Sequence, residues 1–118
     1  MSARFELVLD GRGKFHFQLC SKDDDVLLRG VSCARREQVE LDVNTARRAM
    51  QDVQRLTPFL SYDGGCFLAL KGDDDRVIAR TSRVATKEEL AVIARRIRAV
   101  PEDAPLIDAT DKALHAKH

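Results

Sequence analysis

The 118-residue sequence predicts an α+β fold made of two tandem copies of one β3-α-β unit. The first observation is self-similarity, because a shift of 51 positions places Gly13 on Gly64 and Leu19 on Leu70 without gaps. The second is that the hydrophobic period changes from two to about 3.6 in each half of the chain. A unit of about fifty residues buries too little surface to be stable alone. The two copies should therefore share one core.

The same 51-residue shift aligns residues along most of both halves. Further matched pairs are Leu9 and Leu60, Asp23 and Asp74, Asp24 and Asp75, Val26 and Val77, Arg29 and Arg80, Ala34 and Ala85, Glu37 and Glu88, and Arg47 and Arg98. We therefore expect one domain over residues 1–108, made of repeats 4–52 and 53–108. A polar, disordered tail should follow over residues 109–118.

Strands and then a helix follow in order along the first copy. Residues 5–9 and 14–20 alternate apolar and less apolar side chains, which predicts a hairpin through the glycine-rich turn between them. The aspartates at 23–25 favour a second turn, after which a third strand begins. From about residue 35 the apolar side chains recur at helical spacing, and this helix should end near residues 50–52.

The second copy begins with a strand over about residues 54–62. Pro58 indicates that this strand lies at a sheet edge or contains a bulge, because proline cannot donate a hydrogen bond to a ladder. A strand over 66–70, a turn over 72–75 and a strand from Val77 then repeat the order of the first copy.

A second helix begins at a capping box formed by Thr86 and Glu89, whose side chains can each satisfy a free backbone amide of the first turn. Pro101 ends this helix, and residues 105–108 should form a last short strand. We expect a largely antiparallel sheet with both helices packed on one face.

The repeated pattern is glycine, two aromatic residues and a leucine at alternate positions, then a polar turn, a short Val/Ile run and a helix of small and apolar residues. The first copy carries it at Gly13, Phe15, Phe17, Leu19, Val26, Leu27, Val43 and Ala46, and the second at Gly64, Leu70, Val77, Ile78, Ala94 and Ile97. Over about residues 4–110 the chain resembles the YegP-like family of small bacterial proteins. The resemblance implies repeats that form one sheet and exchange their last strands, an internal pseudo-dimer. It implies no catalytic residues.

Composition limits the partners. The net charge of +1 produces no overall field that would gather nucleic acid or anionic membranes. No apolar run approaches the eighteen or so residues of a membrane span, and the first residues lead straight into a strand pattern. The three cysteines are an odd number without paired spacing, which suits reduced thiols. We expect a cytoplasmic protein that makes no use of a membrane. It should be a monomer, because the repeat already supplies the partner surface.

Neither a metal site nor a reactive thiol is predicted. The residues considered are His16, Cys20, Cys33 and Cys66, and the aspartates at 23–25 and 73–75. The thiols and histidine lack the short paired spacing of zinc ligands, and contiguous aspartates suit turns better than cation loops. On strand parity Cys20 lies on the outward face with His16 and Cys66 lies in the core. His16 is roughly 13 Å along the strand from Cys20, too far to act as its base. We expect no cofactor and no catalytic activity.

The arginine pairs give the strongest remaining signal. Arg47 and Arg48 lie in the first helix, and Arg95 and Arg96 lie in the corresponding part of the second. Together they could form a basic patch that contacts phosphates. Acidic residues on the same helices and the single tyrosine argue against nucleic-acid recognition. The sequence therefore favours a small binding or interaction module whose partner is a protein or small ligand. Weak nucleic-acid or phosphate binding through these four arginines is the alternative.

Overall fold

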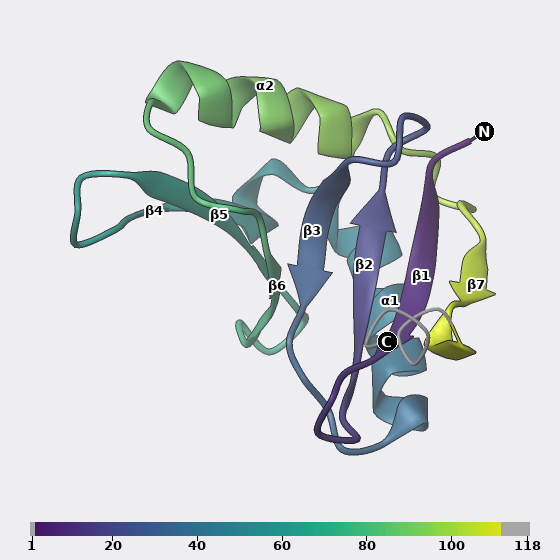
Figure 1. Ribbon diagram of the computed structural model, residues 1–118. Helices are drawn as coiled ribbons and strands as arrows, with labels where there is room; N and C mark the ends of the chain where they lie inside the picture. Colours follow the sequence, from purple (N-terminus) through teal and green to yellow (C-terminus); the bar gives the residue numbers. More distant parts are fainter. Residues whose placement is uncertain (1, 112–118) are drawn as a thin grey trace.

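The alternating side chains form the strands of one mixed sheet in the computed structural model, which describes residues 2–111 (Figure 1). The strands are β1 (Arg4–Leu9), β2 (Phe15–Cys20), β3 (Val26–Gly30), β4 (Leu56–Leu60), β5 (Cys66–Lys71), β6 (Val77–Arg80) and β7 (Leu106–Asp108). The helices are α1 (Arg36–Ala49) and α2 (Lys87–Arg98), with a short 3-10 turn, η1 (Val53–Arg55), before β4. The predicted α+β class is confirmed.

The strand order across the sheet is β4-β5-β6-β3-β2-β1-β7. All neighbouring strands are antiparallel except β1 and β7, which are parallel. The sheet is therefore largely antiparallel, as predicted. β4 lies at one edge, the position that Pro58 indicated, and β7 lies at the other.

Equivalent strands in the two halves of the chain pair in the same register. Phe5 lies opposite Leu19, and Leu56 lies opposite Leu70, 51 residues further along for both partners. β3 meets β6 at the centre of the sheet, where Arg29 lies opposite Arg80. The register shifts at matching places as well, between Leu19 and Cys20 and between Leu70 and Lys71.

The acidic triplets form turns. Asp24 and Asp75 have positive φ values of 68° and 63°, a conformation that aspartate tolerates better than most side chains. In the first of these turns the Ser21 hydroxyl accepts hydrogen bonds from the amides of Asp23 and Asp25, each at 3.2 Å. Such local side-chain-to-backbone hydrogen bonds are typical of turns rich in serine and aspartate.

The core is one continuous cluster that includes residues from both helices and from β1, β2, β3, β4, β5 and β6. The predicted stripe of α1 is buried, including Val39, Val43 and Ala46, whereas Leu41 lies off the stripe and is exposed. Phe5 and Phe17 pack edge to face with ring centroids 5.8 Å apart. Because α1 and α2 contribute to the same cluster, both cover the same face of the sheet. Neither helix has the length and apolar character needed to span a bilayer.

Cys20 keeps the strand parity of His16 that was predicted for it, since it lies opposite Arg4 as His16 lies opposite Val8, and it is buried on that face. The predicted tail begins with Ala109, which is also buried, and its amide donates to the carbonyl of Leu7 at 2.8 Å. Residues 112–118 of the predicted tail lie outside the described residues.

A prediction about stability concerns Gly30. A Cβ atom built on this residue lies 2.5 Å from Cδ1 of Phe17, too close for an undisturbed side chain. In the second half of the chain the smaller Leu68 stands at the position of Phe17, and Thr81 stands at the position of Gly30. The Leu68 amide donates a hydrogen bond to the Thr81 hydroxyl. We expect Gly30→Ala to cost about 1–3 kcal/mol of unfolding free energy through overpacking. Urea denaturation measures this loss.

The double variant Gly30→Ala with Phe17→Leu supplies the control. Since the smaller side chain frees the space that the new methyl group needs, the two losses should be less than additive. Additive losses would show that Phe17 does not impose glycine at this position.

Candidate interaction groove

An apolar groove of about 590 Å³ lies between the edge strand β4 and helix α2. Leu56, Pro58 and Leu60 line it from β4, and Leu90 and Ala94 line it from α2. Lys87 and Arg98 also line it, one from each end of the helix. The β4–β5 hairpin extends away from the rest of the sheet below α2, so this edge is open to solvent (Figure 1).

Large apolar side chains are exposed at this groove. Leu60 is 78% exposed, Val53 63% and Phe59 39%, and all three line it. A contiguous apolar surface beside charged residues marks an interaction site more often than single exposed side chains do. The backbone of β4 adds unpaired groups, because an edge strand has only one neighbour. The groove thus offers both apolar surface and backbone hydrogen bonds.

The opposite edge of the sheet is closed by β7. The amide of Phe5 donates to the carbonyl of Pro105 at 2.8 Å, and the amide of Ala109 donates to that of Leu7 at the same distance. Ala104 and Ala109 are buried at the two ends of this short segment. β7 therefore completes the first half of the sheet through backbone bonds and small buried side chains.

Two arginines of α1 hold the same segment. Nη1 of Arg36 lies 2.8 Å from Oδ2 of Asp108, and Nη2 of Arg47 donates to the carbonyl of Ala104 at 2.7 Å. The guanidinium of Arg47 also lies 5.6 Å from the ring centroid of Phe5. Arg47, predicted as a phosphate ligand, thus bonds to the backbone beside β7.

Two solved structures share this architecture. The solution NMR structure of YegP from E. coli, a protein of unknown function, gives a TM-score of 0.86 at 18% identity and covers 93% of this chain and 95% of its own. The solution NMR structure of a UPF0339 protein from Shewanella oneidensis gives 0.87 at 14% identity and covers 100% of both chains. The chain has a YegP-like fold. No family model and no curated protein matches the sequence.

In this YegP-like fold the other predicted arginines meet different carboxylates. Arg48 of α1 bonds to Asp73 at 3.3 Å, in the turn between β5 and β6. Arg96 of α2 bonds to Asp25 at 2.9 Å, in the turn between β2 and β3. Arg95 is exposed. Each ion pair joins a helix of one half to a turn of the other. Phosphate binding by Arg47, Arg48, Arg95 and Arg96 stays a prediction.

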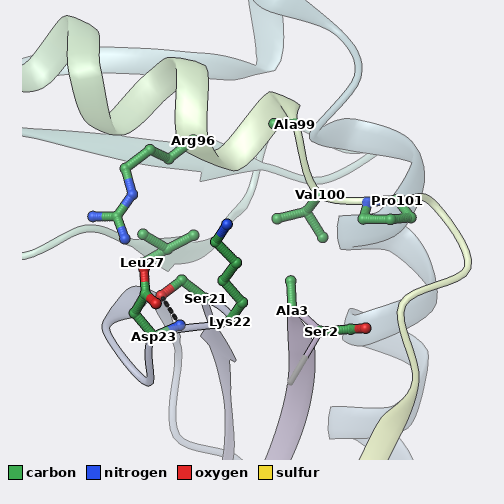
Figure 2. A pocket seen from close by; sticks show the side chains of 10 residues that line it. All are labelled: Ser2, Ala3, Ser21, Lys22, Asp23, Leu27, Arg96, Ala99, Val100 and Pro101. Carbon is green, nitrogen blue, oxygen red and sulfur yellow. Dashed lines mark hydrogen bonds between the residues drawn. The ribbon is translucent and has the colours of Figure 1, made fainter.

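A second hollow, of about 400 Å³, lies where the end of α2 meets the β2–β3 turn (Figure 2). Lys22 and Arg96 extend toward it above Leu27, and Val100 lines its other side (Figure 2). Carboxylates accompany these cations, since Asp23 lines the same hollow and Asp25 bonds to Arg96. Opposite charges thus meet in this hollow, whereas the groove beside β4 is mainly apolar.

Burial limits access to two of the three cysteine thiols. Cys20 and Cys66 are buried, and Sγ of Cys33 lies 3.8 Å from Oδ2 of Asp42. Burial, and then the Asp42 carboxylate, raise the pKa of the Cys33 thiol, which disfavours its nucleophilic thiolate. Burial and the nearby Arg29 lower the pKa of His16. Within the described residues, no three His, Cys, Asp or Glu side chains are grouped to hold a metal ion.

Sequence reasoning missed the groove residues. Lys87 and Arg98 were not singled out as groove residues, because the packing of α2 beside β4 cannot be predicted from local sequence. One local signal was present, because Pro58, Phe59 and Leu60 form an unbroken apolar run in a strand assigned to an edge. A half-buried edge strand would alternate with polar residues instead.

A prediction about pH dependence concerns Asp108, the last residue of β7. The hydroxyl and amide of Thr110, and then the Arg36 guanidinium, hold the pKa of the Asp108 carboxyl well below its usual range. A carboxylate with a depressed folded-state pKa adds stability above its unfolded pKa of about 3.9, and that stability is lost as the pH falls further. We expect Asp108→Asn to be less stable than wild type at pH 6, with the difference shrinking toward pH 2.

Urea unfolding across this pH range measures the effect. Asp103→Asn, an exposed change on the same linker, is the matched control and should leave the pH profile as in wild type. A stability difference at Asp108→Asn that is independent of pH would contradict the assignment.

Proposed function

We propose that this chain is an interaction module that binds a segment of another protein in the groove between β4 and α2. The observation that carries the proposal is an apolar groove along a sheet edge, with Leu60, Phe59 and Val53 exposed beside it. Binding would remove this surface from water, the main source of free energy in protein association. The proposed activity is binding without catalysis.

We further propose that the module is one domain of two tandem β3-α-β repeats arranged as an internal pseudo-dimer. Matched features 51 residues apart support this. They are the bridges Phe15–Cys33 and Cys66–Val84, the positive φ values at Gly13 and Gly64, and the ladders described above. The pairing of β7 with β1 supports an exchange of the last strand, because it joins the end of the second repeat to the first strand of the first.

The proposal includes a monomeric state and a cytoplasmic location. The β3–β6 pairing supports a monomer, because the contact between the two halves is made within one chain. The three free cysteines support a reducing compartment.

Selection from a random peptide library displayed on phage tests the proposed binding. We expect sequences to be enriched on the immobilised protein and to bind Leu60→Asp at least about tenfold more weakly, since a charge would enter the apolar contact. Leu41→Asp is the matched control, because Leu41 is also exposed but lies on α1 outside the groove. Peptides that bind wild type and Leu60→Asp equally, or no enrichment at all, would refute the proposal.

A further inference from the structure

The groove beside β4 corresponds to the site beside β1 that β7 occupies at the other edge of the sheet. We call these two equivalent strand-binding sites seats. Shifting its lining by 51 residues places Leu56 on Phe5, Pro58 on Leu7 and Leu68 on Phe17. Phe5 and Leu7 pair with β7, and Phe17 lies behind them in the same core cluster. Among residues 2–111 one segment, β7, corresponds to two equivalent seats, and this segment occupies the seat beside β1.

The charges at the groove repeat the charges that hold β7. Lys87 stands 51 residues after Arg36, whose guanidinium binds Asp108. Arg98 stands 51 residues after Arg47, which donates to a carbonyl beside β7. Both Lys87 and Arg98 are exposed and line the groove. The second seat therefore retains a cation for an acidic side chain and a second donor for the backbone of an incoming strand.

The backbone of β4 is oriented to accept such a strand. Ser61 donates to the carbonyl of Gly65 at 2.7 Å, so alternation along the antiparallel ladder directs the polar groups of Leu56, Pro58 and Leu60 away from β5. The matching residues of β1 direct theirs toward β7. Pro58 lacks one donor, so a parallel strand loses one hydrogen bond but can keep those to Leu56 and to the carbonyl of Pro58.

We infer that the groove binds an extended segment of a partner protein as a strand parallel to β4, an inference that rests on the proposed function. The sequence of this segment carries a large apolar residue followed two positions later by an acidic residue. In β7 these positions are Leu106, packed against the core, and Asp108. The apolar residue is larger than leucine, because the floor of the empty seat has Leu56 and Leu68 where the filled seat has two phenylalanines.

A second copy of the chain suits this edge less well. Symmetric pairing of two β4 strands is antiparallel, and the proline of each strand would then remove a donor from the shared ladder. The two-fold axis would also bring Lys87 of one copy toward Arg98 of the other, since these residues lie at opposite ends of α2. Like charges brought together in this way oppose association. A partner segment with an acidic residue relieves both conflicts.

The test uses fluorescent peptides of residues 102–110 and the full-length protein. We expect saturable binding by fluorescence anisotropy, tighter when the peptide carries Leu106→Phe. Lys87→Glu should weaken binding about two- to fivefold, as for an exposed ion pair, and Asp108→Lys in the peptide should restore it. Lys14→Glu, in the β1–β2 hairpin outside the groove, is the matched charge control.

Strand direction and location come from NMR of the labelled protein. A nitroxide at the amino end of the peptide should broaden Leu56 more than Leu60, since Leu106 lies opposite Phe5 in the filled seat. Broadening nearest Leu60, perturbation confined to β1, self-association through β4, or no binding at about 1 mM peptide would each overturn the inference. Library peptides that still require Leu60 would in those cases leave the proposed function standing.

Discussion

The pairing of β3 with β6 is the contact on which the rest of the structure depends. It is short, with Arg29 opposite Arg80 and Gly30 opposite Ala79, yet it joins the three strands β4, β5 and β6 to the other four strands in one sheet. The ring of Phe17 lies against Gly30, so the first half packs a large side chain close to the junction. Both helices then pack on the face that this continuous sheet presents. Without the junction each half would expose the flank of its own core.

Ion pairs between the halves reinforce this arrangement. α1 reaches the turn of the second half through Arg48 and Asp73, and α2 reaches the turn of the first half through Arg96 and Asp25. Exposed pairs of this kind contribute little free energy individually. Their value lies in geometry, since each one fixes a helix end against a turn that local sequence alone does not bring near it. One arginine of each pair singled out in the sequence, Arg48 in α1 and Arg96 in α2, is used in this way by the fold.

Local periodicity was enough to predict the elements but not their contacts across the chain. The edge position of β4 is one of the two outcomes that Pro58 indicated. The start of α2 followed from Thr86 and Glu89, where the Thr86 hydroxyl accepts from the Glu89 amide and donates to the Glu89 carboxylate, each at 3.1 Å. The burial of Cys20 could not be predicted from the alternation of its own strand, because it depends on neighbours such as Arg4, which lies opposite it in β1. The groove was equally inaccessible. It exists because β7 pairs with β1, a contact about a hundred residues apart in sequence.

The unequal edges follow from building a repeated unit in a single chain. The segment after α1 begins the second half as β4, whereas the segment after α2 is free to close the first half as β7. Within residues 2–111 the seat beside β1 is filled, and its counterpart beside β4 stays open. An open apolar edge invites unspecific pairing, and Pro58 weakens it by removing a donor. A partner segment that also contacts Lys87, Arg98 and the apolar lining of the groove compensates for the hydrogen bond that Pro58 cannot donate. Pro58 therefore opposes pairing between copies and at the same time increases specificity for such a partner.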